Sequence, residues 1–269
     1  MPASSSNPSA RRGGKYLYAI ASEPDSEIHD LLGLDRQAVY KVTGGPIAAV
    51  VSDIARERVR PERAHLAAHK NVLARLMQES TVLPMAFGII AGTLQDVRRM
   101  LAVHEGEFVE QLERVAGKVE MGLRVTWQVP NIFEYFIDCH QELREARDRL
   151  LGGLREPRQE EKLELGRFFD QLLEEDREAH FLKTQEVLDA CCDSVKRLPL
   201  RQVQEVMNLS LLVERGRLKE FDDAIVTAAR LFDDNYAFDV NGPWAPHNFV
   251  EMNLEPGRSD LAESYAAGR

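Results

Sequence analysis

In the stretch KVEMGLRVTWQ (residues 118–128), apolar and polar side chains alternate without interruption. Because successive side chains of a strand point to opposite faces of a sheet, this pattern predicts a half-buried strand. The apolar parity holds Val119, Met121, Leu123, Val125 and Trp127. The polar parity holds Lys118, Glu120, Gly122, Arg124, Thr126 and Gln128. Its three charged residues form a candidate interaction surface.

This charged row could serve catalysis, docking or only solvation, and its spacing argues against catalysis. The Cα atoms of Glu120 and Arg124 lie about 13 Å apart on a strand, too far for a direct ion pair. Lys118 and Glu120 lie about 6.6 Å apart, which allows a surface pair of at most ~1 kcal/mol. A catalytic carboxylate is usually kept protonated by burial or by a like charge, whereas the charged neighbours of Glu120 are cationic. We therefore expect a docking surface, an interface between two domains, or a solvated face.

The composition predicts a soluble globular protein. The chain has 269 residues, 44% of them hydrophobic and 29% charged, enough for one large domain or two ordinary ones. No run approaches the ~18 apolar residues of a membrane span, so no membrane partner is expected. The net charge of −10 argues against a nucleic-acid partner, because phosphate binding needs a basic surface. Three cysteines do not make a disulfide framework, which indicates a cytoplasmic location.

The two ends of the sequence have the polar composition of disordered segments. The opening MPASSSNPSARRGG has two arginines but no apolar stretch after them, so it is not a secretory signal. We predict a disordered arm over residues 1–14 and a disordered tail over 253–269.

Between these ends, apolar periodicity predicts an α+β fold with two domains. The first half has strand patterns at 15–21, 46–54 and 83–90 and helix patterns at 61–80 and 93–117, ahead of the strand at 118–128. Helices with a single apolar stripe can all lie on one face of a sheet. We therefore expect an N-terminal α+β domain over 15–130, with a mixed sheet and helices on one face.

The second half repeats this theme after a connecting helix and hinge over 131–155. It has a long charged helix at 158–190, a strand at 206–215, a helix at 217–234 and a short strand at 236–240. This order predicts a C-terminal ferredoxin-like α+β domain over 156–252, with a long helix. Trp127 and Trp244 both flank apolar runs, and we expect both to anchor the core.

His65 and His69 are the candidates for a metal site, because four residues along a helix place them on one face. The zinc-protease motif needs a glutamate after its first histidine, and this chain has Leu66 there. Solvated or half-buried histidines are the alternative that we favour. The sequence has no nucleophile elbow, phosphate loop or dinucleotide fingerprint. We predict no catalytic residue, no metal and no cofactor.

Three blocks of the sequence together resemble one known family. They are AHLAAHKNVLARLMQESTVLPMAFG (64–88), GKVEMGLRVTW (117–127) and GPWAPHNFVEM (242–252). The combination is similar to the gas vesicle protein F/L family, and the resemblance extends over residues 15–252. The chain departs from the usual family pattern at Ala86, where a basic residue is common. It also departs at Ala245 and His247, in a loop that often reads GPWPPY.

The resemblance implies an accessory protein without enzymatic activity, needed to build the hollow protein shells that give microbes buoyancy. It implies a location at the gas vesicle in the cytoplasm, and contacts with the shell protein and other gas vesicle accessory proteins. A shell subunit that is apolar on its gas side is prone to aggregate before assembly. A soluble acidic partner could hold it by adding a strand to a sheet edge or by docking a helix.

The alternative function is a ferredoxin-like domain that binds a small ligand, or acts as an enzyme, in a cleft between the two domains. Such a site needs polar groups that converge in a pocket. The sequence offers only scattered histidines for this role, so no small-molecule substrate is expected. A bound small molecule or an activity with a cofactor would favour this alternative.

Overall fold

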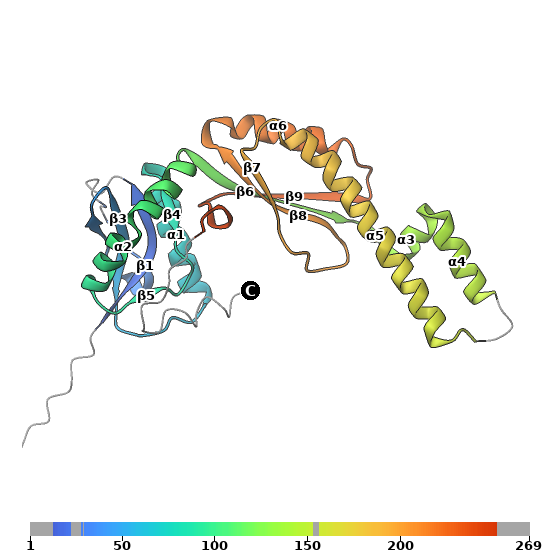
Figure 1. Ribbon diagram of the computed structural model, residues 1–269, viewed down its shortest axis with the longest axis horizontal. Helices are drawn as coiled ribbons and strands as arrows, with labels where there is room; N and C mark the ends of the chain where they lie inside the picture. The colour runs from blue at the N-terminus through green and yellow to red at the C-terminus, as the bar shows by residue number, and fades with distance from the viewer. Residues whose placement is uncertain (1–12, 23–27, 29, 153–155, 252–269) are drawn as a thin grey trace, which may run out of the picture. The chain divides into compact units, whose positions relative to one another are not determined.

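The computed structural model describes residues 13–22, 28, 30–152 and 156–251. The chain forms two compact units: one contains the chain up to Lys118 and again from Trp244, and the other is Val119–Pro243. Each unit has a sheet of its own (Figure 1). The predicted tail over 253–269 and most of the predicted arm over 1–14 lie outside the described residues, and Gly14 begins the first strand.

The first unit is built around a five-stranded sheet in the order β2-β3-β1-β4, with β5 also paired to β1. The strands are β1 (Gly14–Ser22), β2 (Val39–Gly44), β3 (Ile47–Ile54), β4 (Val82–Pro84) and β5 (Ile90–Ala91). The pairings described in this sheet are antiparallel, so our prediction of a mixed sheet is wrong. A tight turn joins β2 directly to β3, and Gly45 in this turn has a φ of 62°, which glycine tolerates.

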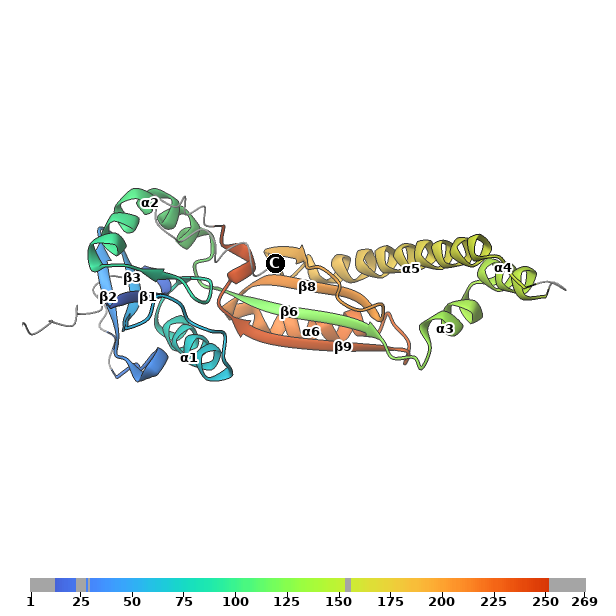
Figure 2. The same ribbon diagram turned by 90° about the horizontal axis from the view of Figure 1, so that it is seen from below.

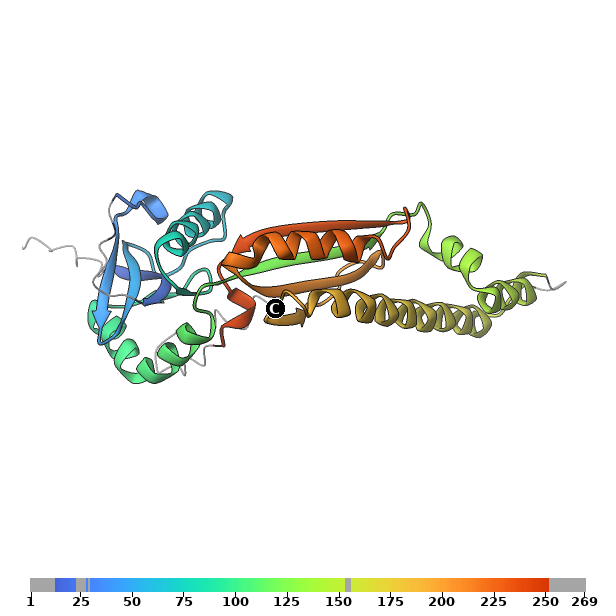
Figure 3. The same ribbon diagram turned by 90° about the horizontal axis from the view of Figure 1, so that it is seen from above.

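Two helices cover this sheet, α1 (Arg63–Glu79) and α2 (Leu94–Arg114). Figures 2 and 3 show the strands between them, with one helix on each face. Our prediction of helices on one face is therefore wrong. In β1 and β3, side chains of both parities are buried almost throughout. A sheet with two apolar faces needs a covering layer on each.

The second unit has a four-stranded sheet in the order β7-β8-β6-β9. The strands are β6 (Lys118–Trp127), β7 (Ser194–Arg197), β8 (Glu205–Glu214) and β9 (Tyr236–Trp244). Helix α5 (Gln159–Leu188) precedes β7, and α6 (Leu218–Ala229) lies between β8 and β9. The elements thus follow the β-α-β-β-α-β order of ferredoxin-like folds. Figures 1 and 3 show α5 and α6 over the same face of the sheet.

Strand β6, which the alternation at 118–128 predicts, lies in this second sheet. The Trp127 N–H donates to the Gln204 carbonyl (2.9 Å), and the Gln128 N–H donates to the Asn235 carbonyl (2.6 Å). The end of β6 is thus bonded to the residues just before β8 and β9, so β6 runs antiparallel to both strands. The division in the structure therefore differs from the domain boundary that we expected at residue 130, because β6 pairs with later strands.

Helices α3 (Ile132–Cys139) and α4 (Gln141–Leu151) also belong to the second unit and pack with α5, so they are more than the connection that we expected over 131–155. The expected hinge falls partly on residues outside the described ranges. Phe136 on α3 packs edge-on against Trp127, with ring centroids 5.4 Å apart. Trp127 is only 2% exposed, which confirms it as a core anchor.

Among the residues described, no helix is both long and apolar enough to span a membrane.

Candidate interaction surfaces

The charged row of β6 is half-buried rather than openly solvated. Glu120 is 7% exposed, and Lys118 and Arg124 have intermediate exposure. The Nε atom of Arg124 lies 3.7 Å from Oε1 of Glu205 at the start of β8, while 43% of the Arg124 side chain stays exposed. Within the row, the side chain of Arg124 is thus partly exposed, whereas Glu120 is buried.

Glu205 is a member of this surface that the sequence reasoning missed. It is 3% exposed, and its Oε2 accepts a hydrogen bond from the Arg201 N–H (2.6 Å). Its backbone carbonyl accepts from Nε of Arg177 on α5 (2.9 Å). Together with the Arg124 contact, these bonds tie the loop before β8 to both β6 and α5. The available signal was an acidic residue directly before the alternating strand pattern 206–215. A carboxylate that is buried there needs cationic or N–H partners.

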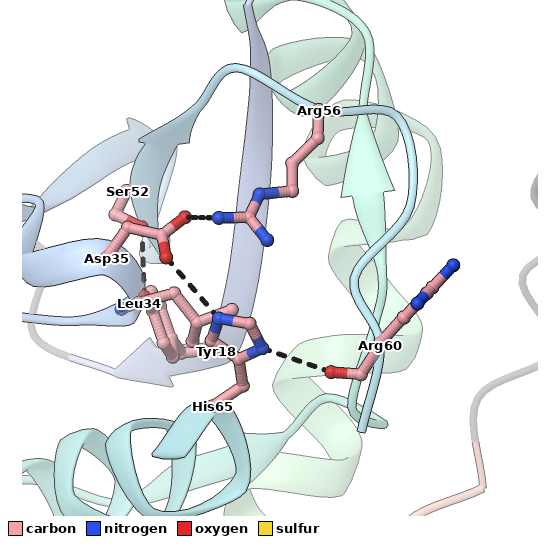
Figure 4. A network of polar contacts seen from close by, with 7 residues as sticks. All are labelled: Tyr18, Leu34, Asp35, Ser52, Arg56, Arg60 and His65. Atoms are coloured by element: carbon pink, nitrogen blue, oxygen red, sulfur yellow. Dashed lines mark hydrogen bonds and ion pairs between the residues drawn. The ribbon is translucent and has the colours of Figure 1, made fainter. Parts of the chain in front are cut away.

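In the first unit, the Tyr18 hydroxyl holds a short 3-10 turn, η1 (Leu34–Arg36), against the sheet (Figure 4). The hydroxyl oxygen accepts the Leu34 N–H (2.8 Å) and lies 2.9 Å from the Ser52 hydroxyl. A Cβ atom at Gly33 would lie 2.0 Å from the Tyr18 hydroxyl, so this position needs glycine. Burial raises the pKa of Tyr18, which keeps its proton available for hydrogen bonding.

Asp35 extends this cluster from η1 toward α1, as Figure 4 shows. Its carboxylate pairs with Arg56 (2.7 Å) and lies 3.3 Å from Nε2 of His65. The Nδ1 atom of His65 donates to the Arg60 carbonyl (3.1 Å). Asp35 and Arg36 both have left-handed backbones, with φ of 51° and 59°, which cost free energy outside glycine. The ion pair between Asp35 and Arg56 helps to offset that cost, and His65 lies in the same cluster of polar contacts.

His69 lies one turn further along α1 and has different partners. Its Nδ1 is 2.9 Å from the Tyr16 hydroxyl, whose oxygen also accepts the Gly88 N–H (3.1 Å). Burial, with a smaller contribution from the nearby His247, lowers the pKa of His69 to about 4, so the ring is neutral at pH 7. His65 and His69 thus serve separate networks. Within the described ranges, no group of three histidine, cysteine or acidic side chains is placed to hold a metal ion.

Trp244, the last residue of β9, begins a segment that belongs to the first unit, and we name Trp244–Glu251 the C-terminal strap. The Gln111 carboxamide on α2 donates to the Glu251 carbonyl and accepts from its N–H (2.8 Å). Arg114, also on α2, donates to the Phe249 carbonyl. Phe249 itself is 4% exposed, so the strap is fixed both by a buried side chain and by its backbone.

The prediction that Trp244 anchors the core is wrong. The side chain is 43% exposed, and Lys70 on α1 lies over its ring at 5.3 Å from the centroid. The buried apolar positions of the strap are Ala245, Pro246 and Phe249 instead. Trp244 therefore marks the exposed beginning of the strap.

Known proteins match almost the whole described chain. Residues 14–251 match the family model of gas vesicle synthesis protein GvpL/GvpF. Gas vesicle protein F of Streptomyces sp. (strain CB03234) is 31% identical over 242 residues, which cover 88% of this chain and 99% of the relative. Crystal structures of GvpF from Anabaena sp. PCC7120 and from Microcystis aeruginosa share the fold, with TM-scores of 0.80 and 0.77 at 24% and 20% identity. Each covers 89% of this chain and 99% of the solved one. As its three sequence blocks indicated, the chain belongs to the GvpL/GvpF family of gas vesicle synthesis proteins.

Proposed function

We propose that this protein is a non-enzymatic accessory protein of gas vesicle assembly, which acts through contacts with the shell protein and with other accessory proteins. The observation that carries this proposal is the family match over residues 14–251, which spans both units. A relative that aligns over 99% of its own length is named gas vesicle protein F, which further supports a role at the gas vesicle.

We further propose that the β6 row contributes to such a contact through Arg124. Its side chain is 43% exposed and lies 3.7 Å from the Glu205 carboxylate, so part of it is available to a partner while the ion pair restricts its motion. Joint replacement of Glu120 and Arg124 by alanine should weaken partner binding, with Thr126→Ala on the same parity as the control. If both partner binding and stability stayed unchanged, the row would be only a solvated face.

The proposed function is tested by deleting the gene in its host and scoring cell flotation and light scattering by the vesicles. We expect vesicles to be lost and to return when the wild-type copy is restored. Vesicles that persist unchanged in a strain without related copies would contradict the proposal. A complementing chain can also be truncated in one unit at a time. If vesicles return with a chain truncated in one unit, the intact unit carries the role.

A further inference from the structure

Two of the three cysteines, Cys191 and Cys192, are neighbours in the sequence and lie just beyond the end of α5. Their Sγ atoms are 3.8 Å apart. Neighbouring side chains inside a helix diverge by about 100°, but here the chain has already left the helix. The N–H groups of both cysteines donate to the Leu188 carbonyl (3.0 Å each), and the guanidinium of Arg217 donates to the Ala190 carbonyl (2.6 Å). These bonds hold a tight turn in which the two thiols meet.

The two thiols differ in exposure and in hydrogen bonding. Cys191 is 4% exposed, whereas Cys192 has intermediate exposure. The thiol of Cys191 donates to the Leu188 carbonyl (3.4 Å). Since its single proton is used there, Cys192 is the donor in the contact between the two sulfurs. A lone pair of Cys191 therefore faces the sulfur of Cys192, and Cys192 is the thiol that a reagent in solvent can reach.

A disulfide bond between these two residues would be readily reversible. Adjacent Cα atoms lie about 3.8 Å apart across a trans peptide, which is closer than the ~4.4–6.8 Å of ordinary disulfides. A bond formed at this separation stores strain and is therefore easier to reduce, as labile and regulatory disulfides are. The pair is thus suited to changing between a reduced and an oxidised state, and not to permanent cross-linking.

We propose that Cys191 and Cys192 form a redox-active dithiol whose oxidant is a small-molecule disulfide. The thiolate of Cys192 attacks one sulfur of the oxidant, which releases one small thiol and leaves a mixed disulfide on Cys192. The sulfur of Cys191 then attacks Sγ of Cys192 and displaces the second small thiol. The pair loses two electrons and two protons, and the oxidant is reduced to two thiols that carry those protons. This inference goes beyond the proposed function and does not depend on it.

The test treats the full, reduced chain with excess oxidised glutathione. Burial raises the pKa of both thiols, so few thiolates are present at pH 7 and the reaction is run at mildly alkaline pH. Acid then stops the exchange, and N-ethylmaleimide under denaturing conditions labels every thiol that remains. We expect mass spectrometry to find the peptide with both cysteines lighter by two hydrogen atoms. This peptide should take up maleimide only after reduction.

Cys139 on α3 is the internal control, because it is exposed and should keep a glutathione adduct. The reaction continues until Cys139 carries this adduct. In the variant Cys191→Ser, the reaction should stop at a glutathione adduct on Cys192, because the second thiol is missing. In the variant Cys192→Ser, the buried Cys191 should stay unmodified.

Two free thiols in the wild-type pair, or a stable glutathione adduct on Cys192, would overturn the inference. A disulfide that joins either cysteine to Cys139, or to a second copy of the chain, would overturn it as well. These outcomes are read on the wild-type chain, so they do not depend on how well either variant folds.

Discussion

Strands β1 and β9 both have nine residues, yet their surroundings are opposite. In β1, the six positions from Tyr16 to Ala21 are all buried, because strands flank it on both sides and a helix lies on each face. In β9, which ends its sheet beside β6, the six positions from Asp239 to Trp244 are all exposed.

This contrast separates two tasks within one chain. A central strand buried on both faces contributes most to the free energy of unfolding. An exposed edge strand contributes less, and it leaves backbone and side-chain groups for a partner. We therefore expect substitutions in the first sheet to act on folding, and substitutions at the rim of the second sheet to act on recognition.

The largest effect is expected from truncating the core of the first sheet. Ile20 on β1 is fully buried, so Ile20→Ala should lower the free energy of unfolding by about 2–5 kcal/mol. Val240→Ala on β9, where the side chain is 36% exposed, should cost less than ~1 kcal/mol. Urea unfolding measures both, since the two tryptophans lie in different units and each can be replaced by phenylalanine to isolate the other. Similar losses for the two variants would contradict the contrast.

A smaller loss is expected at Gly33, where the turn η1 meets the first sheet. A Cβ atom there would lie 2.0 Å from the Tyr18 hydroxyl, so Gly33→Ala should cost about 1–3 kcal/mol by overpacking. Gly166→Ala in the exposed part of α5 is the matched control, because its Cβ meets nothing within 4 Å. Alanine should stabilise that helix by ~0.5–1 kcal/mol. Thermal unfolding should show a lower stability for Gly33→Ala and a higher one for Gly166→Ala. If Gly33→Ala left the stability unchanged, the turn η1 would be able to shift without cost.

The sequence predicted individual strands and helices more readily than it predicted which strands pair with one another. The alternation at 118–128 identified β6 and its two faces, because side-chain period is a local property. The strands beside β6 were not predictable, because its pairing depends on Gln204 and Asn235, far along the chain. Strand β7, with four residues, is too short to show a period. The predicted strand at 83–90 is split into β4 and β5, and Gly88 turns the chain between them with a φ of 94°.

The same limit applied to the candidate surface. Spacing along one strand correctly placed Lys118, Glu120 and Arg124 on one parity. It could not reveal that the partner of Arg124 is Glu205, because that contact joins two strands separated by several helices. The burial of Glu120 was also hidden, since alternation suggests which face a residue is on but not what covers that face. Whether the row binds a partner stays a prediction.

His69 in the first unit should make the free energy of unfolding depend on pH, an effect of intermediate size. Its pKa is lowered from 6.5 to about 4 in the folded state, mainly by burial, so the unfolded chain binds more protons between these values. Stability should therefore fall as the pH falls, by up to about 2 kcal/mol between pH 6.5 and 5. Urea unfolding at several pH values measures the slope. His69→Gln should flatten it, and an unchanged slope would assign the effect to other groups.

The smallest effect on stability is expected from a substitution that loosens the C-terminal strap, the segment that continues from the exposed strand β9. Gln111→Leu removes both hydrogen bonds to the Glu251 backbone, at a cost of about 1 kcal/mol. Hydrogen exchange should then accelerate in residues 245–251, while exchange in β1 stays slow. Gln171→Leu on α5, which removes only a surface bond to Glu175, should leave the strap unchanged. If strap exchange were the same in both variants, the two bonds from Gln111 would not be what protects the segment. The burial of strap residues such as Phe249 would then account for its protection.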